Sequence, residues 1–142
     1  MRLNPRGEAE YRARLAQRYL SEAEEAFKLG NYRLAVSSSQ LSVKNSAKAV
    51  IALSKTPSWS HDPSYELIET IQTIPEELRE KAQELARIAR TLAPEHGRVT
   101  YGEPIRGLTP WEIYNKEDAE EAIQKARRAK EIMDEILQRY LG

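Results

Sequence analysis

The sequence predicts an all-α fold, an antiparallel up-and-down four-helix bundle with an additional short helix and a long loop before the last helix. Apolar residues recur every three or four positions over the long segments, which is the period of one helix face, and no segment shows the alternation of a strand. A chain of 142 residues has the size of one domain with one core. We therefore expect a single domain over residues 1–142, with residues 1–7 flexible.

The first two predicted helices span residues 8–29 and 32–54 and form a hairpin. Gly30 favours a left-handed helix end, and the Asn31 side chain is suited to accept hydrogen bonds from the first free N–H groups of the second helix. Helices joined this closely pack antiparallel. The middle of the second helix is rich in serine, which favours close packing with the hydroxyls bonded to the preceding turn. Alternatively, this helix or the last helix forms the seam of a dimer.

The remaining helices follow a proline-containing loop at 56–63. A short helix is predicted over 64–72, and a fourth helix starts with Pro75 in its first turn and ends before Pro94. Residues 94–114 are predicted as a long loop with aromatic anchors. Either this loop has a functional role, or its aromatic residues only cover one end of the core. The last helix begins at Asn115, with Asp118 as the acidic partner of a capping box.

The composition excludes several classes of function. Charged residues make up 31% of the chain and balance to a net charge of +0, so no overall field favours nucleic acid or membranes. The absence of cysteine removes disulfides, thiol nucleophiles and thiolate zinc sites. No segment has the apolar length of a signal peptide or a membrane span, so we expect a cytoplasmic protein without membrane association. We expect no cofactor and no metal.

The adjacent residues His61 and Asp62 have two interpretations. Metal-dependent phosphohydrolases use such pairs, but their sites need further histidines, and His96 is the only other one in this chain. The alternative is structural. Asp62 or Ser64 then caps the short helix, and His61 bonds a backbone carbonyl in the loop.

Four segments, in their order and spacing, carry a family resemblance. They are YLSEAEEAFKLGNYRLAV at 19–36, QLSVKNSAKAVIAL at 40–53, HD at 61–62 and NKEDAEEAIQKARRAKEIM at 115–133. Together they resemble the HEPN family, whose name denotes a nucleotide-binding domain of higher eukaryotes and prokaryotes. The resemblance covers most of the chain. The chain departs from the family pattern at Lys44, where archaeal relatives often carry an acidic residue.

The resemblance implies an up-and-down bundle that forms a homodimer and is encoded beside a small nucleotidyltransferase. RNA-cleaving relatives use an arginine followed after four to six residues by a histidine, and Arg90 and His96 match this pattern with five residues between them. Histidine exchanges a proton near neutral pH, and arginine stabilises charge developing on a phosphate. Short motifs also match by chance, and Pro94 lies between the two residues.

A phosphate-binding site is predicted from four other residues. Lys44 and Lys48 lie one turn apart on the second helix, and Arg98 and Tyr101 lie in the glycine-containing segment after the fourth helix. Together they would form a basic pocket with an aromatic wall for a nucleotide or an RNA end. The alternative is that both lysines are solvated or paired with acids.

These observations give three hypotheses for function. The first is a HEPN-type binding module, a homodimer that associates with a nucleotidyltransferase partner and binds nucleotide or RNA. The second is a metal-independent, toxin-like endoribonuclease that acts through Arg90 and His96. The third is a structural dimer without a ligand.

Overall fold

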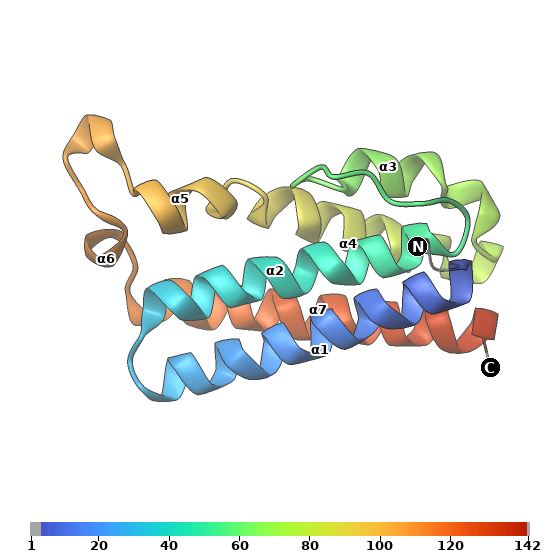
Figure 1. Cartoon of the computed structure of the whole chain (residues 1–142), viewed down its shortest axis with the longest axis horizontal. Helices are drawn as coiled ribbons and strands as arrows, with labels where there is room; N and C mark the ends of the chain where they lie inside the picture. Colours follow the sequence, from blue (N-terminus) through green and yellow to red (C-terminus); the bar gives the residue numbers. More distant parts are fainter. Residues whose placement is uncertain (1–3, 142) are drawn as a thin grey trace.

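The computed structural model describes residues 4–141 as a bundle of helices (Figure 1). Its long helices are α1 (Pro5–Lys28), α2 (Tyr32–Ala52), α4 (Arg79–Leu92) and α7 (Lys116–Leu141). The shorter elements are α3 (Ser64–Glu69), η1 (Ile71–Thr73), η2 (Glu76–Leu78), α5 (Glu95–Tyr101), η3 (Pro104–Arg106) and α6 (Pro110–Ile113). The predicted all-α class is confirmed. Within residues 4–141, β-structure is limited to one isolated bridge between Glu103 and Leu108.

Helix α2 is the centre of the bundle. It packs against α1, α7, α4 and α5, and fifteen of its 21 residues are buried. Figure 1 shows α1 and α7 along one side of α2, with α4 and α5 following one another along the other. Because α2 has neighbours around most of its circumference, polar residues on it are forced into the interior or into the seams between helices.

The serine-rich part of α2 forms a seam inside the chain. Ser38, Ser39, Ser42 and Ser46 are all fully buried. The hydroxyl of Ser42 donates to the backbone carbonyl of Ala16 at 2.7 Å, and that of Ser38 donates to Glu22 Oε1 at 2.6 Å. The predicted close packing is therefore confirmed, although these two hydroxyls bond to α1 rather than to the preceding turn. These serines are not available to a second subunit.

The helix ends largely match the capping signals in the sequence. Gly30 adopts a φ of 74°, Asn31 Oδ1 accepts from Leu34 N–H at 3.2 Å, and Asn115 and Asp118 form the reciprocal capping box. Helix α1 starts earlier than predicted because Asn4 Oδ1 accepts from Gly7 N–H at 2.7 Å and Pro5 fits the first turn. Of the stretch expected to be flexible, residues 1–3 lie outside the described residues, and residues 5–7 are helical.

The region around the third and fourth helices is more broken than predicted. The short helix ends at Glu69, and η1 follows it. Pro75 has an extended backbone with a ψ of 138° and precedes η2, so the α-helical part of the fourth helix begins only at Arg79.

The segment predicted as a long loop contains three short helical elements. Helix α4 ends at Leu92 as predicted, but Pro94 has helical angles and starts α5, because the N–H that proline lacks is not needed in a first turn. Gly102 then reverses the chain at a φ of 68°, and a Cβ atom there would lie 2.2 Å from Leu108 O. The helical elements η3 and α6 follow, and α6 starts at Pro110 for the same reason as α5.

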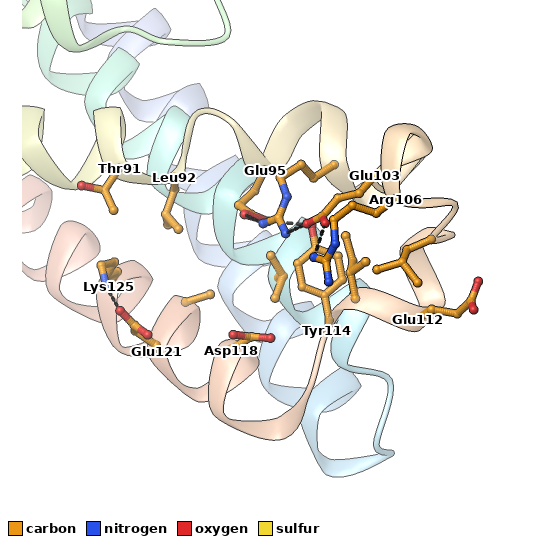
Figure 2. Close-up of a pocket in the computed structure, with 15 residues that line it drawn as sticks. Thr91, Leu92, Glu95, Glu103, Arg106, Glu112, Tyr114, Asp118, Glu121 and Lys125 are labelled. Carbon is orange, nitrogen blue, oxygen red and sulfur yellow. Dashed lines mark hydrogen bonds and ion pairs between the residues drawn. The ribbon is translucent and has the colours of Figure 1, made fainter.

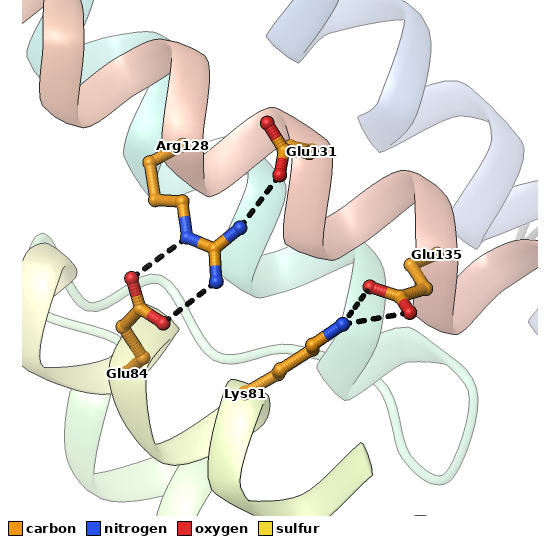
Figure 3. Close-up of polar contacts among 5 residues, drawn as sticks. All are labelled: Lys81, Glu84, Arg128, Glu131 and Glu135. Atoms are coloured by element: carbon orange, nitrogen blue, oxygen red, sulfur yellow. Dashed lines mark hydrogen bonds and ion pairs between the residues drawn. The ribbon is translucent and has the colours of Figure 1, made fainter.

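Ion pairs tie α7 to its neighbours. Arg128 on α7 contacts both carboxylate oxygens of Glu84 on α4, at 2.8 and 2.9 Å, and Lys81 pairs with Glu135 at 2.7 Å (Figure 3). Because the side chains of these pairs are partly exposed to solvent, each pair contributes at most about 1 kcal/mol to the free energy of unfolding. In the described residues, no helix is both long enough and apolar enough to cross a membrane.

Candidate functional site

Five basic side chains from four parts of the fold gather on one side of α2. Lys44 and Lys48 come from α2, Arg12 from α1, His61 from the loop after α2, and His96 from α5. We call these five residues the cationic cluster. Their proximity shows in their effects on one another. Arg12 lowers the pKa of both lysines, after the larger effect of burial, and Lys44 lowers that of His96.

Lys48 is the most buried member of the cluster, with an exposed fraction of 4%. Burial, followed by the charges of Lys44 and Arg12, lowers its pKa to about 8. Glu66 of α3 opposes this shift, but its carboxylate pairs with Lys55 at 3.0 Å and accepts from Ser58 N–H at 2.9 Å. Within residues 4–141, neither Lys44 nor Lys48 forms an ion pair, so the acid pairing that was one part of the predicted alternative is not found. Lys44 is partly exposed, as the other part of that alternative, a solvated lysine, requires.

Arg12 is held in place by both helices of the hairpin. Its Nε donates to Glu8 Oε1 on α1 at 3.2 Å, and its Nη1 donates to Asn45 Oδ1 on α2 at 3.2 Å. Asn45 in turn donates to the carbonyl of Leu41 at 2.8 Å. Glu8 neutralises one positive charge, so the cluster carries an excess of positive charge through Lys44 and Lys48.

The imidazoles of His61 and His96 stack, with centroids 3.6 Å apart and planes 21° apart. The loop after α2 runs back along the bundle toward α5 (Figure 1), and in this way His61 reaches His96 in the first turn of α5. Burial, then His61 and Lys44, lower the pKa of His96. His61 therefore packs on a side chain rather than bonding a loop carbonyl as predicted.

Asp62 has the structural role predicted for it. Its Oδ1 accepts from Ser64 N–H at 3.0 Å, directly before α3. Within residues 4–141, no group of three or more histidine, cysteine, aspartate or glutamate side chains is placed to hold a metal ion.

Arg98 and Tyr101 are not part of the cationic cluster. Arg98 lies two residues after His96, and two residues turn a helix by about 200°, so the two side chains leave α5 on opposite sides. Arg98 faces a cavity of about 390 Å³ between α5, α6 and α7, where it pairs with Glu95 and Glu103 (Figure 2). Tyr101 is 73% exposed. The predicted pocket that joins all four ligand residues is therefore wrong.

The polar side chains around the cavity at Arg98 form hydrogen bonds with one another. Tyr114 donates its hydroxyl to Glu95 Oε2 at 2.6 Å, and burial together with this carboxylate raises the pKa of Tyr114. Arg106 donates to the second oxygen of Glu103 at 2.6 Å. Figure 2 shows these side chains turned toward one another. They connect α5 to Glu103 in the turn that follows it and to Tyr114 between α6 and α7, and this restrains the helix that carries His96.

The predicted pair of Arg90 and His96 is split between two helices. Arg90 lies near the end of α4, where its guanidinium is 4.5 Å from the centre of the Tyr65 ring and donates to the Tyr65 hydroxyl. His96 lies beyond the turn at Pro94 and stacks on His61. No hydrogen bond joins the two residues in this chain.

Sequence reasoning missed Arg12 and the stacking role of His61. Arg12 is one of many basic residues on α1, and only the packing of α1 against α2 singles it out. His61 was recognisable as a titratable residue in a proline-flanked loop, but its partner is 35 positions further along the chain.

Comparison with known proteins agrees with this architecture. The crystal structure of TT1696 from Thermus thermophilus has the same fold, with a TM-score of 0.71 and 20% sequence identity over 94% of this chain and 98% of that one. The search of curated proteins gave no match. The HEPN domain profile matches residues 9–136, which include all of α2 and α4 and all but the outer ends of α1 and α7. This chain therefore belongs to the HEPN family.

Proposed function

We propose that this protein is a HEPN-type binding module whose cationic cluster binds the phosphate group of a nucleotide or of RNA. The observation that carries the proposal is the burial of Lys48 next to Lys44, where no carboxylate of residues 4–141 forms an ion pair with it. A buried ammonium is costly unless an opposite charge compensates it. A phosphate would supply that charge and would accept hydrogen bonds from lysine, arginine and histidine together.

The architecture of the cluster suits an exchangeable ligand better than a structural role. Its members come from α1, α2, a loop and α5, so an anion held among them contacts four parts of the fold. A carboxylate from the chain itself would have neutralised the cluster permanently. Glu66, which is close enough to influence Lys48, is instead engaged by Lys55 and Ser58.

We further propose that the protein is a homodimer and acts with a small nucleotidyltransferase partner. Membership of the HEPN family supports this assembly. Ser38, Ser39, Ser42 and Ser46 of α2 are fully buried inside the chain, so they do not support a dimer seam on that face. Light scattering of the purified chain tests the dimer, since a monomer has a mass of 16.3 kDa. A mass near that value at working concentration contradicts it.

Anion binding is tested by titrating the protein with AMP in low salt and measuring the heat of binding. Wild type should bind, and the variant K44Q/K48M should bind at least about tenfold more weakly, because each charged hydrogen bond contributes about 1.5 to 3 kcal/mol. The matched control is Lys116→Gln, which removes an exposed lysine at the start of α7. Equal affinity of all three proteins, or no binding by wild type, contradicts the proposal.

A metal-independent endoribonuclease is the second candidate. The stacked imidazoles beside Lys44 favour it, because a group that exchanges protons then lies next to a cation. Under this hypothesis His96→Ala abolishes cleavage of a test RNA while circular dichroism shows unchanged helicity. Equal cleavage by the variant excludes this site. Arg90→Ala tests whether Arg90 and His96 act as a pair. If they do, this variant must be as inactive in RNA cleavage as His96→Ala.

A further inference from the structure

The groove between α3 and α4 is a second feature that the cationic cluster does not use. It has a volume of about 360 Å³. Tyr65 and Ile68 of α3 line one wall, and Ala86 and Arg90 of α4 line the other. Tyr65 is 64% exposed and Ile68 is 45% exposed, so two large apolar side chains border an open groove.

Tyr65 and Arg90 contact each other between the two walls of the groove. The guanidinium carbon lies 4.5 Å from the centre of the Tyr65 ring, and the guanidinium donates to the Tyr65 hydroxyl, so each group restrains the other. Aromatic rings and guanidinium groups are the side chains on which nucleic-acid bases stack. The groove therefore offers two groups on which a flat, aromatic ligand can stack.

Polar side chains around the groove can form hydrogen bonds with the edge of a nucleobase. Ser64 lines the groove and is 5% exposed, and its hydroxyl has no hydrogen-bond partner among the described residues. A buried hydroxyl without a partner is unfavourable, so a ligand that bonds to it gains binding energy. Gln83 and Arg87 are exposed on the rim and offer amide and guanidinium donors.

The groove adjoins the cationic cluster. Ser64 follows His61 by three residues, so their Cα atoms are at most about 10 Å apart. Helix α3 serves both sites, since it presents Tyr65 to the groove while Glu66 acts on Lys48. A nucleotide with its phosphate on the cluster would therefore reach the groove with its base.

We propose that the groove between α3 and α4 binds the nucleobase of the ligand, with Tyr65 and Arg90 as the stacking groups and Ser64 as a hydrogen-bonding group. This inference rests on the proposed function, because the cationic cluster holds the phosphate. It makes the ligand a nucleotide or a nucleic-acid end rather than a simple phosphate or a sugar phosphate.

The test compares ribose 5-phosphate with AMP, which differ by the base alone. Wild type should bind AMP about tenfold or more tightly than ribose 5-phosphate, since stacking of one base has an effect of that size. Tyr65→Ala should remove this difference and leave the affinity for ribose 5-phosphate unchanged. Tyr140→Ala, which removes a partly exposed tyrosine on α7, is the matched control and should retain the difference.

Ser64→Ala gives an independent readout. It should reduce the preference for AMP without lowering the melting temperature, because the hydroxyl makes no hydrogen bond in the described structure. A lower melting temperature with an unchanged preference for AMP contradicts its proposed role.

Each failure has a separate signature. Equal affinity of wild type for AMP and ribose 5-phosphate overturns the base site while the phosphate site stands. Absence of binding of both ligands overturns both proposals. A change from dimer to monomer in Tyr65→Ala, measured by light scattering, means that a second copy of the chain covers the groove, and this also overturns the base site.

Discussion

His61 and His96 stack at 3.6 Å across 35 positions of sequence, and this contact joins the loop after α2 to the first turn of α5. Burial, followed by the neighbouring His61 and Lys44, lowers the pKa of His96. Protonation of His96 therefore adds a positive charge next to Lys44.

The free energy of unfolding should fall as the pH is lowered from 7.5 to 5.5. The pKa of His96 in the folded protein lies below its value of about 6.5 in the unfolded chain, so the unfolded state takes up the proton first and is favoured. Urea unfolding at several pH values measures this effect. In His61→Phe, which keeps a ring against His96 but removes one charge, the fall should be smaller. If the free energy of unfolding of the variant falls with pH as steeply as that of wild type, the histidine pair is not the cause of the fall.

Lys48→Met should stabilise the protein by about 1 to 3 kcal/mol at pH 7, because it replaces a largely buried ammonium, which pairs with no carboxylate of residues 4–141, by an apolar side chain of similar length. The pKa of Lys48 is about 8 when folded and higher when unfolded, so wild type gains stability as the pH rises above 8. The advantage of the variant over wild type should therefore shrink at pH 9.5. Lys116→Met is the control and should change stability by less than about 0.5 kcal/mol. Destabilisation by Lys48→Met contradicts the account of an uncompensated charge.

Gly102→Ala should destabilise the protein by about 2 kcal/mol or more. Its φ of 68° is unfavourable for alanine, and the added Cβ would lie 2.2 Å from Leu108 O, which is a backbone atom. Gly97→Ala is the matched control, since no atom lies within 4 Å of its added Cβ and it lies inside α5. That substitution should stabilise by about 0.5 to 1 kcal/mol. Thermal unfolding of the two variants should therefore give melting temperatures shifted in opposite directions.

Arg128→Lys should destabilise the protein by about 0.5 kcal/mol in low salt. Lysine cannot reproduce the two parallel contacts that the guanidinium makes with Glu84 (Figure 3), and both side chains are about one third exposed. The loss should decrease when the salt concentration is raised. Glu131→Gln, which weakens the more exposed contact of the same arginine, should have a smaller effect. Chemical denaturation at two salt concentrations compares the variants, and a loss that does not depend on salt contradicts an electrostatic origin.

The sequence predicted the body of the fold because the signals involved are local. Helix periodicity, the left-handed Gly30 and the caps at Asn31 and Asn115 depend on residues within one or two turns of each other. The same local reasoning failed at Pro94 and Pro110. Proline both ends a helix and starts one, and the packing of the following segment decides between the two.

The candidate site was predicted only in part. Lys44 and Lys48 were found because their spacing of four puts them on one helix face. Arg98 was misplaced because its side of α5 relative to α2 is not a local property. Arg12 and the pairing of His61 with His96 were not predictable at all, since each depends on which helices are neighbours.

Read alone, the amino-acid sequence establishes an all-α chain of four long helices with defined ends, together with its resemblance to the HEPN family. Which side chains meet is a property of the packed molecule: the cationic cluster around the buried Lys48, the separate network at Arg98, and the groove at Tyr65 and Arg90. The difference is one of range. Periodicity and capping act over a few residues, whereas a site assembled from α1, α2, a loop and α5 is fixed by the packing of the whole core.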